Sequence, residues 1–198
     1  MRGLAAVQAG GAAGATKGCS GNSPVVDELI NVKQGVPTIV APAVETQKGF
    51  QYFLSNVDQT LAGVPLHVIY SFKAEGKGNE EAAEVMREAL ARVLVHYHPL
   101  AGRLAISSEE GRLVVDCTGE GVVFVEADAD CRLEHIGDVS KPDPVALGKL
   151  FYSVPGAENV LGIPLLVAQV LLISFPSGDY ATIGSQILSP IHNAFLTT

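Results

Sequence analysis

One long stretch of the chain follows a helical period of hydrophobic and polar residues, and shorter alternating runs surround it. Between residues 79 and 97, apolar residues recur at i, i+3, i+4 and i+7, which predicts an amphipathic helix. Asn79 is suited to cap this helix, Glu80 and Glu81 carry carboxylates in its first turn, and Pro99 ends it. The apolar stripe contains Ala82, Val85, Met86, Ala89, Leu90, Val93, Leu94 and Tyr97. The residues expected to face solvent are Glu84, Arg87, Glu88 and Arg92.

Shorter runs rich in β-branched residues predict strands on both sides of this helix. They lie at Val36–Val40, Phe50–Leu54, Val64–Phe72, Arg103–Ile106, Arg112–Cys117, Val122–Ala127 and Ile163–Val170. The turn Ser107–Gly111 predicts a hairpin, and the near-continuous apolar run Ile163–Val170 predicts a strand buried on both faces. A short helix is expected at Pro142–Leu150. The pattern predicts an α/β (α+β) fold with a mixed sheet and flanking helices.

The two ends of the chain have different patterns. Residues 1–30 begin with a stretch rich in Ala and Gly that lacks the apolar run of a signal peptide, so we expect a low-complexity flexible extension. Residues 171–198 keep neither a period of 2 nor one of 3.6 for long, and we expect a non-homologous tail. Pro164 interrupts the apolar run 159–175, which is shorter than the ~20 residues that a spanning helix needs. No membrane span is predicted.

Composition and charge exclude several classes of partner. Apolar residues make up 47% of the chain and charged residues 17%, which indicates a folded protein. The net charge is −8 and the 13 basic residues are scattered, so nucleic acid is not an expected partner. The three cysteines form no CxxC pair, which predicts neither a zinc site nor a disulfide framework. The odd number of cysteines and the lack of an Asn-x-Ser/Thr sequon favour a cytoplasmic location, with Cys117 and Cys131 as buried thiols.

The histidines do not identify a reaction by their spacing. They are His67, His96, His98, His135 and His192. His96 and His98 end the predicted helix, where a cation meets the negative end of the dipole. Two residues apart on a helix they point to different sides, so they are poor joint metal ligands.

A series of sequence segments across residues 31–170 resembles a known family. The segments are VKQGVPTIVAP from Val32, FLSNVDQ at Phe53–Gln59, VLVHYHPLAGRL at Val93–Leu104, GRLVVDCTGEGVVFVEADAD at Gly111–Asp130, KPDPVALGKL, and IPLLVAQV. In order and spacing they resemble the N-terminal part of BAHD acyl-CoA-dependent acyltransferases, particularly the plant hydroxycinnamoyl transferase group. The resemblance implies an incomplete chloramphenicol-acetyltransferase-like domain over residues 31–170, with the second domain missing.

The resemblance also implies an activity, which this chain is not equipped to perform alone. In the family, an acyl group such as feruloyl moves from a CoA thioester to an alcohol such as an omega-hydroxy fatty acid. Acyl-CoA is a co-substrate, and no cofactor stays bound. The family's general base is the His of an HxxxD motif, and a DFGWG motif supports the fold. Here no His has Asp four residues later and the chain contains no Trp, so we assign no catalytic residue and expect inactivity.

Two substrate-binding candidates follow from the same resemblance. The resemblance implies an active-site tunnel between two domains. Alignment on Leu54–Asp58 places Val68 and Tyr70 on the strand that lines the acceptor side of this tunnel, and alternation puts both side chains on one face. Tyr70 offers a hydroxyl or a ring, although ordinary core packing is the alternative for both residues.

Two functional hypotheses remain open. One is a truncated acyltransferase. Its tail from Val170 is then a translated intron, because many genes of the family carry an intron near this Gln-Val and every Val codon begins with the splice-donor dinucleotide GT; a genuine splice variant is the alternative. The other is a non-enzymatic module that binds a full-length relative or another partner. Uncovered apolar surface favours association or aggregation; soluble, monodisperse protein would support the module, and insolubility the truncated enzyme.

Overall fold

The computed structural model describes residues 5–7, 31–62, 64–73, 81–130, 148, 150–154, 161, 163–173 and 180–188. The first strands along the chain are β1 (Ala5–Val7), β2 (Asn31–Gln34), β3 (Thr38–Val40) and β4 (Gln51–Phe53). They are followed by α2 (Asn56–Leu61), β5 (Pro65–Lys73), α3 (Ala82–His96) and the 3-10 helix η2 (His98–Ala101). The remaining strands are β6 (Arg103–Ile106), β7 (Leu113–Asp116), β8 (Val122–Asp130), β9 (Leu166–Ile173) and β10 (Tyr180–Leu188).

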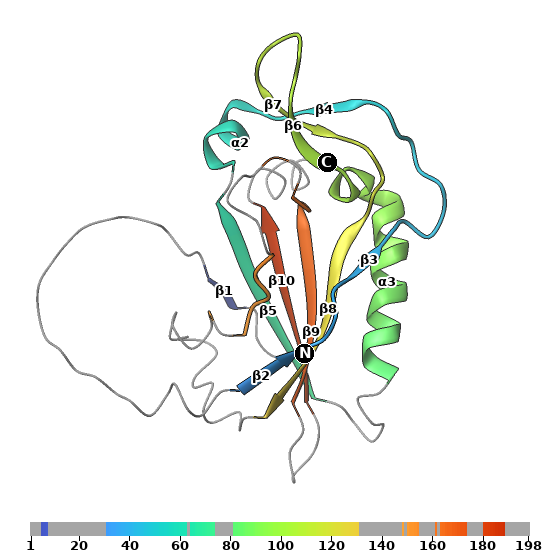
Figure 1. Cartoon of the computed structure of the whole chain (residues 1–198), viewed down its shortest axis with the longest axis vertical. Coiled ribbons are helices and arrows are strands. Elements are labelled where there is room, and N and C mark those ends of the chain that lie inside the picture. Colours follow the sequence, from blue (N-terminus) through green and yellow to red (C-terminus); the bar gives the residue numbers. More distant parts are fainter. Residues whose placement is uncertain are drawn as a thin grey trace, which may run out of the picture.

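A seven-stranded mixed sheet forms the centre of the described fold (Figure 1). Its order is β1-β5-β10-β9-β8-β2, and β3 also pairs with β8. Strands β8 and β9 are parallel, whereas the other pairs are antiparallel. Gly35 lies between β2 and β3, where a Cβ atom would stand 2.9 Å from the carbonyl oxygen of Glu126. The chain therefore needs glycine there to stay close to β8.

A three-stranded sheet of order β4-β7-β6 lies at one end of the large sheet (Figure 1). Strands β6 and β7 form the predicted hairpin, in which the Ser107 N–H donates to the Arg112 carbonyl at 2.8 Å. Helix α2 begins with a capping box, because Ser55 and Asp58 each accept from the other's backbone N–H. The Gln59 side chain exchanges two hydrogen bonds with the backbone of Leu113 and so ties α2 to β7.

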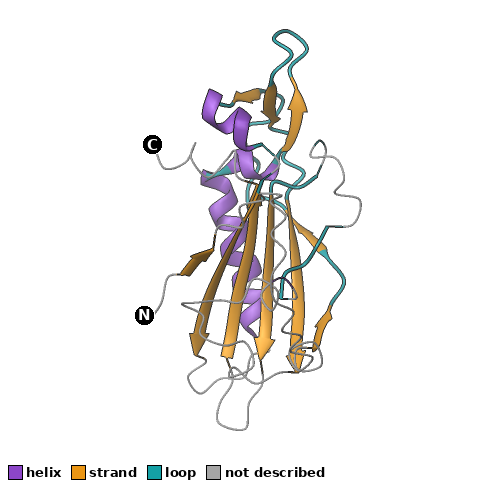
Figure 2. Ribbon diagram, turned by 90° about the vertical axis from the view of Figure 1, so that its left-hand side faces the viewer, coloured by secondary structure: helices purple, strands orange, loops and turns teal. Residues whose placement is uncertain are grey.

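Helix α3 packs against one face of the large sheet (Figure 2). The buried cluster on that face contains Val40, Leu94, Ala101, Val122, Phe124, Leu166 and Val170. On the opposite face, Val123, Val125 and Val167 are buried under Tyr152 and Val154. Alternate residues of β9 thus join two different clusters, which confirms the prediction of a strand buried on both faces.

The predicted apolar stripe of α3 is wider than the face that the sheet covers. Met86 and Leu90 pack on the cluster and Leu94 is fully buried, but Val85 and Val93 are 61% and 46% exposed. One sheet face can contact only part of a stripe this broad. Arg87, expected to face solvent, instead reaches across to β8. Asn79, the predicted cap, lies outside the described residues, and α3 begins at Ala82.

Several elements lie where the sequence predicted none. β2 and α2 are short and polar, and they are held by pairing with β8 and by the bonds to Leu113. β1 pairs with β5 inside the segment predicted as a flexible extension. β10 lies inside the predicted tail and pairs along its length with both β5 and β9. Backbone pairing on two sides explains a strand whose side chains give no clear period. The helix predicted at Pro142–Leu150 lies outside the described residues except for positions 148 and 150.

Candidate functional site

The two predicted substrate-binding residues share one face of β5. Tyr70 pairs with Ile183 of β10, which pairs with Val170 of β9. Val170 belongs to the cluster beneath α3, so Tyr70 faces the same side of the sheet as that helix. Val68 is two residues away and has the same orientation. Tyr70 is 38% exposed, and it therefore lies at the accessible part of this face.

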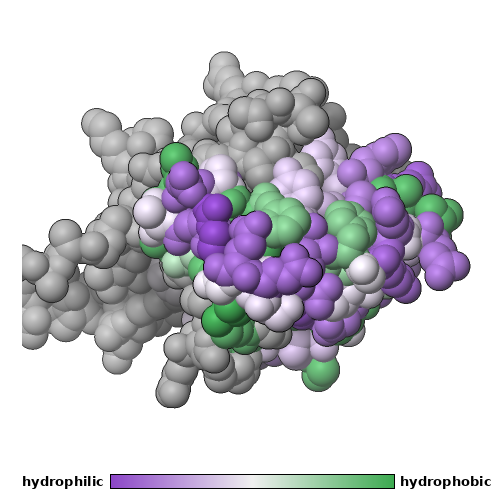
Figure 3. All heavy atoms as spheres, turned by 90° about the horizontal axis from the view of Figure 1, so that it is seen from above, coloured by the Kyte–Doolittle hydropathy of each residue, from purple (hydrophilic) through white to green (hydrophobic). Residues whose placement is uncertain are grey.

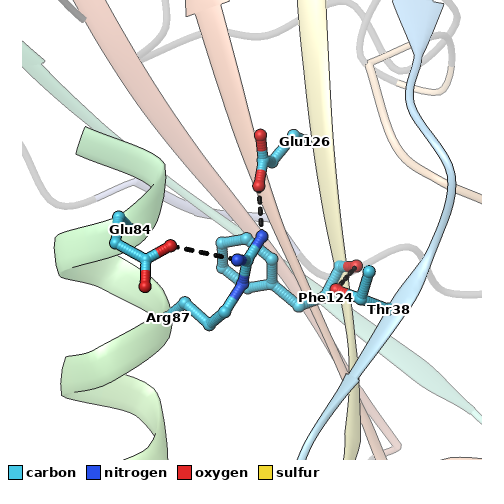
Figure 4. Close-up of polar contacts among 5 residues, drawn as sticks. All are labelled: Thr38, Glu84, Arg87, Phe124 and Glu126. Carbon is cyan, nitrogen blue, oxygen red and sulfur yellow. Dashed lines mark hydrogen bonds and ion pairs between the residues drawn. The ribbon is translucent and has the colours of Figure 1, made fainter. Parts of the chain in front are cut away.

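An ion-pair network from α3 to β8 positions the helix on this face (Figure 4). The Arg87 guanidinium pairs with Glu84 at 3.0 Å and with Glu126 of β8. Its central carbon lies 5.2 Å from the ring centroid of Phe124, which is a cation–π distance. The Thr38 hydroxyl donates to the Phe124 carbonyl at 3.3 Å and links β3 to the same point. Arg87 thereby links the helix to β8.

The opposite face of the sheet carries His67, which alternates with Val68. Its ring lies 4.3 Å from the Phe151 ring, centroid to centroid, and burial lowers the pKa of the imidazole. The Tyr152 N–H donates to the Gln169 side-chain oxygen at 2.7 Å and holds the segment 150–154 over this face. His67 therefore packs as a neutral ring away from the face that carries Tyr70.

The described residues do not assemble a recognisable catalytic group. None of their His, Cys, Asp and Glu side chains gather in threes that could hold a metal ion. Cys117 is buried, as predicted, and burial together with nearby Asp116 raises the pKa of its thiol to about 11. A thiol with this pKa is not a nucleophile at neutral pH. Cys131 lies outside the described residues.

A second location of interest is a cavity of about 490 Å³ where α3 ends. Its lining residues are Gln47, Phe50, Tyr52, His96, Tyr97, His98 and Pro99. His96 and His98 do not share a helix, because α3 ends at His96 and His98 begins η2, and both line this cavity. No pattern in the sequence indicated this cavity, because its lining comes from two segments that are far apart in the chain, 47–52 and 96–99.

The face of the molecule that is seen from above does not single out another site among the described residues. Seen from above, hydrophobic and hydrophilic residues are interspersed over the described part of the molecule (Figure 3). No helix among the described residues has the length and the apolar character that crossing a membrane requires.

Comparison with known proteins decides the family. The family model described as the transferase family matches residues 31–182. The chain belongs to this family. The resemblance to BAHD acyltransferases read from the sequence segments is thereby confirmed. The match includes β2 through β9 and the first residues of β10.

Two plant relatives of this transferase chain come from Arabidopsis thaliana. The chain is 58% identical to omega-hydroxypalmitate O-feruloyl transferase over 141 residues, which are 71% of this chain and 30% of that protein. It is 52% identical to fatty alcohol:caffeoyl-CoA acyltransferase over 145 residues, which are 72% of this chain and 33% of that protein. The chain thus spans about a third of the length of the curated relatives it matches.

A solved structure supports the predicted fold of this transferase chain. The crystal structure of vinorine synthase matches with a TM-score of 0.60 at 22% identity and covers 79% of this chain and 38% of that one. The mixed α/β architecture predicted from the sequence is therefore confirmed, as part of a larger fold.

Proposed function

We propose that this chain is the N-terminal part of an acyl-CoA-dependent O-acyltransferase that moves a hydroxycinnamoyl group, such as feruloyl, to an aliphatic alcohol. The observation that carries the proposal is the 58% identity to omega-hydroxypalmitate O-feruloyl transferase. The second relative, named for fatty alcohol and caffeoyl-CoA, combines the same two classes of substrate. We also propose that the protein is located in the cytoplasm.

The proposed reaction needs a base that this chain lacks. The acceptor hydroxyl loses its proton as its oxygen attacks the thioester carbonyl carbon. A C–O bond forms, the C–S bond breaks, and the proton ends on the released CoA thiol. The family's base is the His of an HxxxD motif. None of the five His in this chain has Asp four residues later, because those positions hold Ser71, Leu100, Gly102, Val139 and Leu196. The 198-residue chain is therefore expected to be inactive alone.

Within this proposal, Val68 and Tyr70 contribute to the acceptor side of the substrate tunnel. Their shared orientation and the 38% exposure of Tyr70 support contact with a ligand. The side chains are neutral, which suits an alcohol with a long apolar chain better than a charged acceptor.

A chimera tests the proposal directly. Residues 31–170 of this chain replace the matching segment of the Arabidopsis feruloyl transferase, which would supply HxxxD and DFGWG. We expect the chimera to make the ester from feruloyl-CoA and 16-hydroxypalmitate, measured by mass spectrometry, whereas the 198-residue chain makes none.

Substitutions in the chimera separate substrate contact from folding. Tyr70→Ala is expected to raise KM for the alcohol more than KM for feruloyl-CoA. Tyr152→Phe is the matched control, because Tyr152 packs on the other face of the sheet. A folded chimera without transfer, or transfer by the 198-residue chain itself, contradicts the proposal.

A further inference from the structure

Helix α3 has a second apolar surface, which the large sheet does not cover. It consists of Val85, Ala89 and Val93, and all three residues are exposed. Because they are spaced four residues apart, they form one straight ridge along the helix. Met86 and Leu90, which pack on the sheet, lie on an adjoining face. The ridge Val85-Ala89-Val93 is therefore apolar surface in addition to the face that attaches α3 to the sheet.

The known contacts of α3 leave this ridge accessible. The Ala43 N–H, between β3 and β4, donates to the Ala91 carbonyl at 2.8 Å, and Arg87 reaches Glu126 of β8. At 3.6 residues per turn, Ala91 and Ala89 point about 160° apart, so the contact with Ala43 lies on the side of the helix away from the ridge. Figure 1 shows α3 at the margin of the fold, beside β3 and β8. A second protein surface can therefore approach the ridge.

The charged residues beside the ridge are complementary to a copy of themselves. Glu88 and Arg92 follow one side of the ridge, are 59% and 75% exposed, and pair with each other at 3.3 Å. When a second α3 lies antiparallel with the two Ala89 residues at the centre, Val85 of one copy is opposite Val93 of the other, because each is four residues from Ala89. Glu88 of one copy is then about 3 Å along the axis from Arg92 of the other. The four charged side chains form one cluster of alternating sign.

Other arrangements of the two helices do not have this complementarity. A parallel pair places Glu88 beside Glu88 and Arg92 beside Arg92, and like charges in contact are unfavourable. The antiparallel pair also opposes the two helix dipoles. Ala89, at the crossing point, is small enough to let the two backbones approach closely. Both the spacing of the ridge and the order of the charges therefore fit a second copy of the same helix.

We propose that the ridge Val85-Ala89-Val93 binds the same ridge of a second copy of this chain, in an antiparallel pair of α3 helices centred on Ala89. Such a contact is isologous, because both copies contribute the same residues. One helix ridge is smaller than the surface of about 800 Å² that each partner contributes to a stable interface, so we expect a weak dimer with a Kd of about 100 µM. The dimer does not depend on the transfer reaction.

Sedimentation equilibrium of the full chain, from about 10 µM to about 1 mM, tests the proposal. We expect the unsubstituted chain to change from monomer to dimer over this range. Ala89→Glu is expected to raise the Kd at least tenfold, because it brings two like charges together at the centre. Glu110→Arg is the control, since it changes an exposed charge in the turn between β6 and β7, and its Kd is expected to stay unchanged. A chain that stays monomeric at the highest concentration, even if its ridge binds the remaining part of a family transferase, overturns the proposal.

Charge reversal tests the partner and the orientation together. Glu88→Arg leaves only basic side chains beside the ridge and Arg92→Glu leaves only acidic ones, so each variant alone is expected to dimerise about tenfold more weakly. An equimolar mixture of the two variants is expected to recover the dimer, because opposite charges then face each other. Circular dichroism checks that the helix content is unchanged. The same Kd for all variants, or a mixture that associates no better than either variant alone, refutes the antiparallel pair.

Discussion

The attachment of α3 to the large sheet rests more on apolar packing than on its ion pairs, and two substitutions separate these contributions. Leu94 is fully buried in the cluster beneath the helix, so Leu94→Ala is expected to cost about 2–5 kcal/mol of unfolding free energy. Arg87 forms its ion pairs with Glu84 and Glu126, whose side chains are 63% and 47% exposed. Such pairs contribute about 0.2–1 kcal/mol each, and the contact with Phe124 adds a similar amount. Because Met keeps most of the apolar stem, Arg87→Met is expected to cost only about 1 kcal/mol.

Urea unfolding followed by far-UV circular dichroism measures both effects, since the chain has no Trp for a fluorescence signal. Added salt provides a second test. It is expected to reduce the difference in unfolding free energy between Arg87→Met and the unsubstituted chain, and to leave the unfolding free energy lost in Leu94→Ala unchanged. If Arg87→Met destabilises the chain as much as Leu94→Ala does, the helix is held by charge and this reasoning is wrong.

Two further predictions concern the small sheet. Gly102→Ala is expected to destabilise the chain by about 3 kcal/mol or more in urea, because the new Cβ would lie 2.3 Å from the Asp116 carbonyl oxygen. Gly111→Ala, in open space at φ +65°, is the control and is expected to cost about 1 kcal/mol. Equal losses would contradict the steric argument. Cys117 is expected to resist iodoacetamide at pH 8 in peptide-mapping mass spectrometry, because burial raises its pKa from 9.0 to about 11. The folded state then holds this proton more tightly, so this contribution to stability is complete below pH 9 and is lost as the pH rises toward 11. Rapid labelling of Cys117 in the folded chain would contradict the assigned burial.

The elements that could be predicted are those whose side chains reflect one clear environment. The helix α3 has a strong period, and β9 is apolar on both faces because two clusters enclose it. β2 and β10 could not be predicted in the same way. Their pairing is supplied by strands far away in the sequence, and β10 is enclosed by β5 and β9 whatever the pattern of its own residues. That residues 171–198 are unrelated to the family stays a prediction.

One of the two candidate sites could be predicted from the sequence, and the other could not. Val68 and Tyr70 came from the resemblance alone, and alternation correctly put both on one face of β5. The cavity at the end of α3 requires Phe50, Tyr52 and His98 to meet, and only the tertiary structure brings their segments together. The spacing of His96 and His98 suggested that they diverge on a helix, whereas the helix ends between them.

The most recognisable segment of the chain has a structural explanation in this fold. In His98–Arg103, Gly102 is required by the approach of the Asp116 carbonyl. Arg103 donates from its guanidinium to the Gly121 carbonyl at 2.8 Å and pairs with Glu120 at 3.3 Å. These contacts join β6 of the small sheet to the residues just before β8 of the large sheet. Sequence identity with the relatives at such residues is therefore stronger evidence for a shared fold than for a shared reaction. The reaction depends on the His of an HxxxD motif, which this chain does not contain.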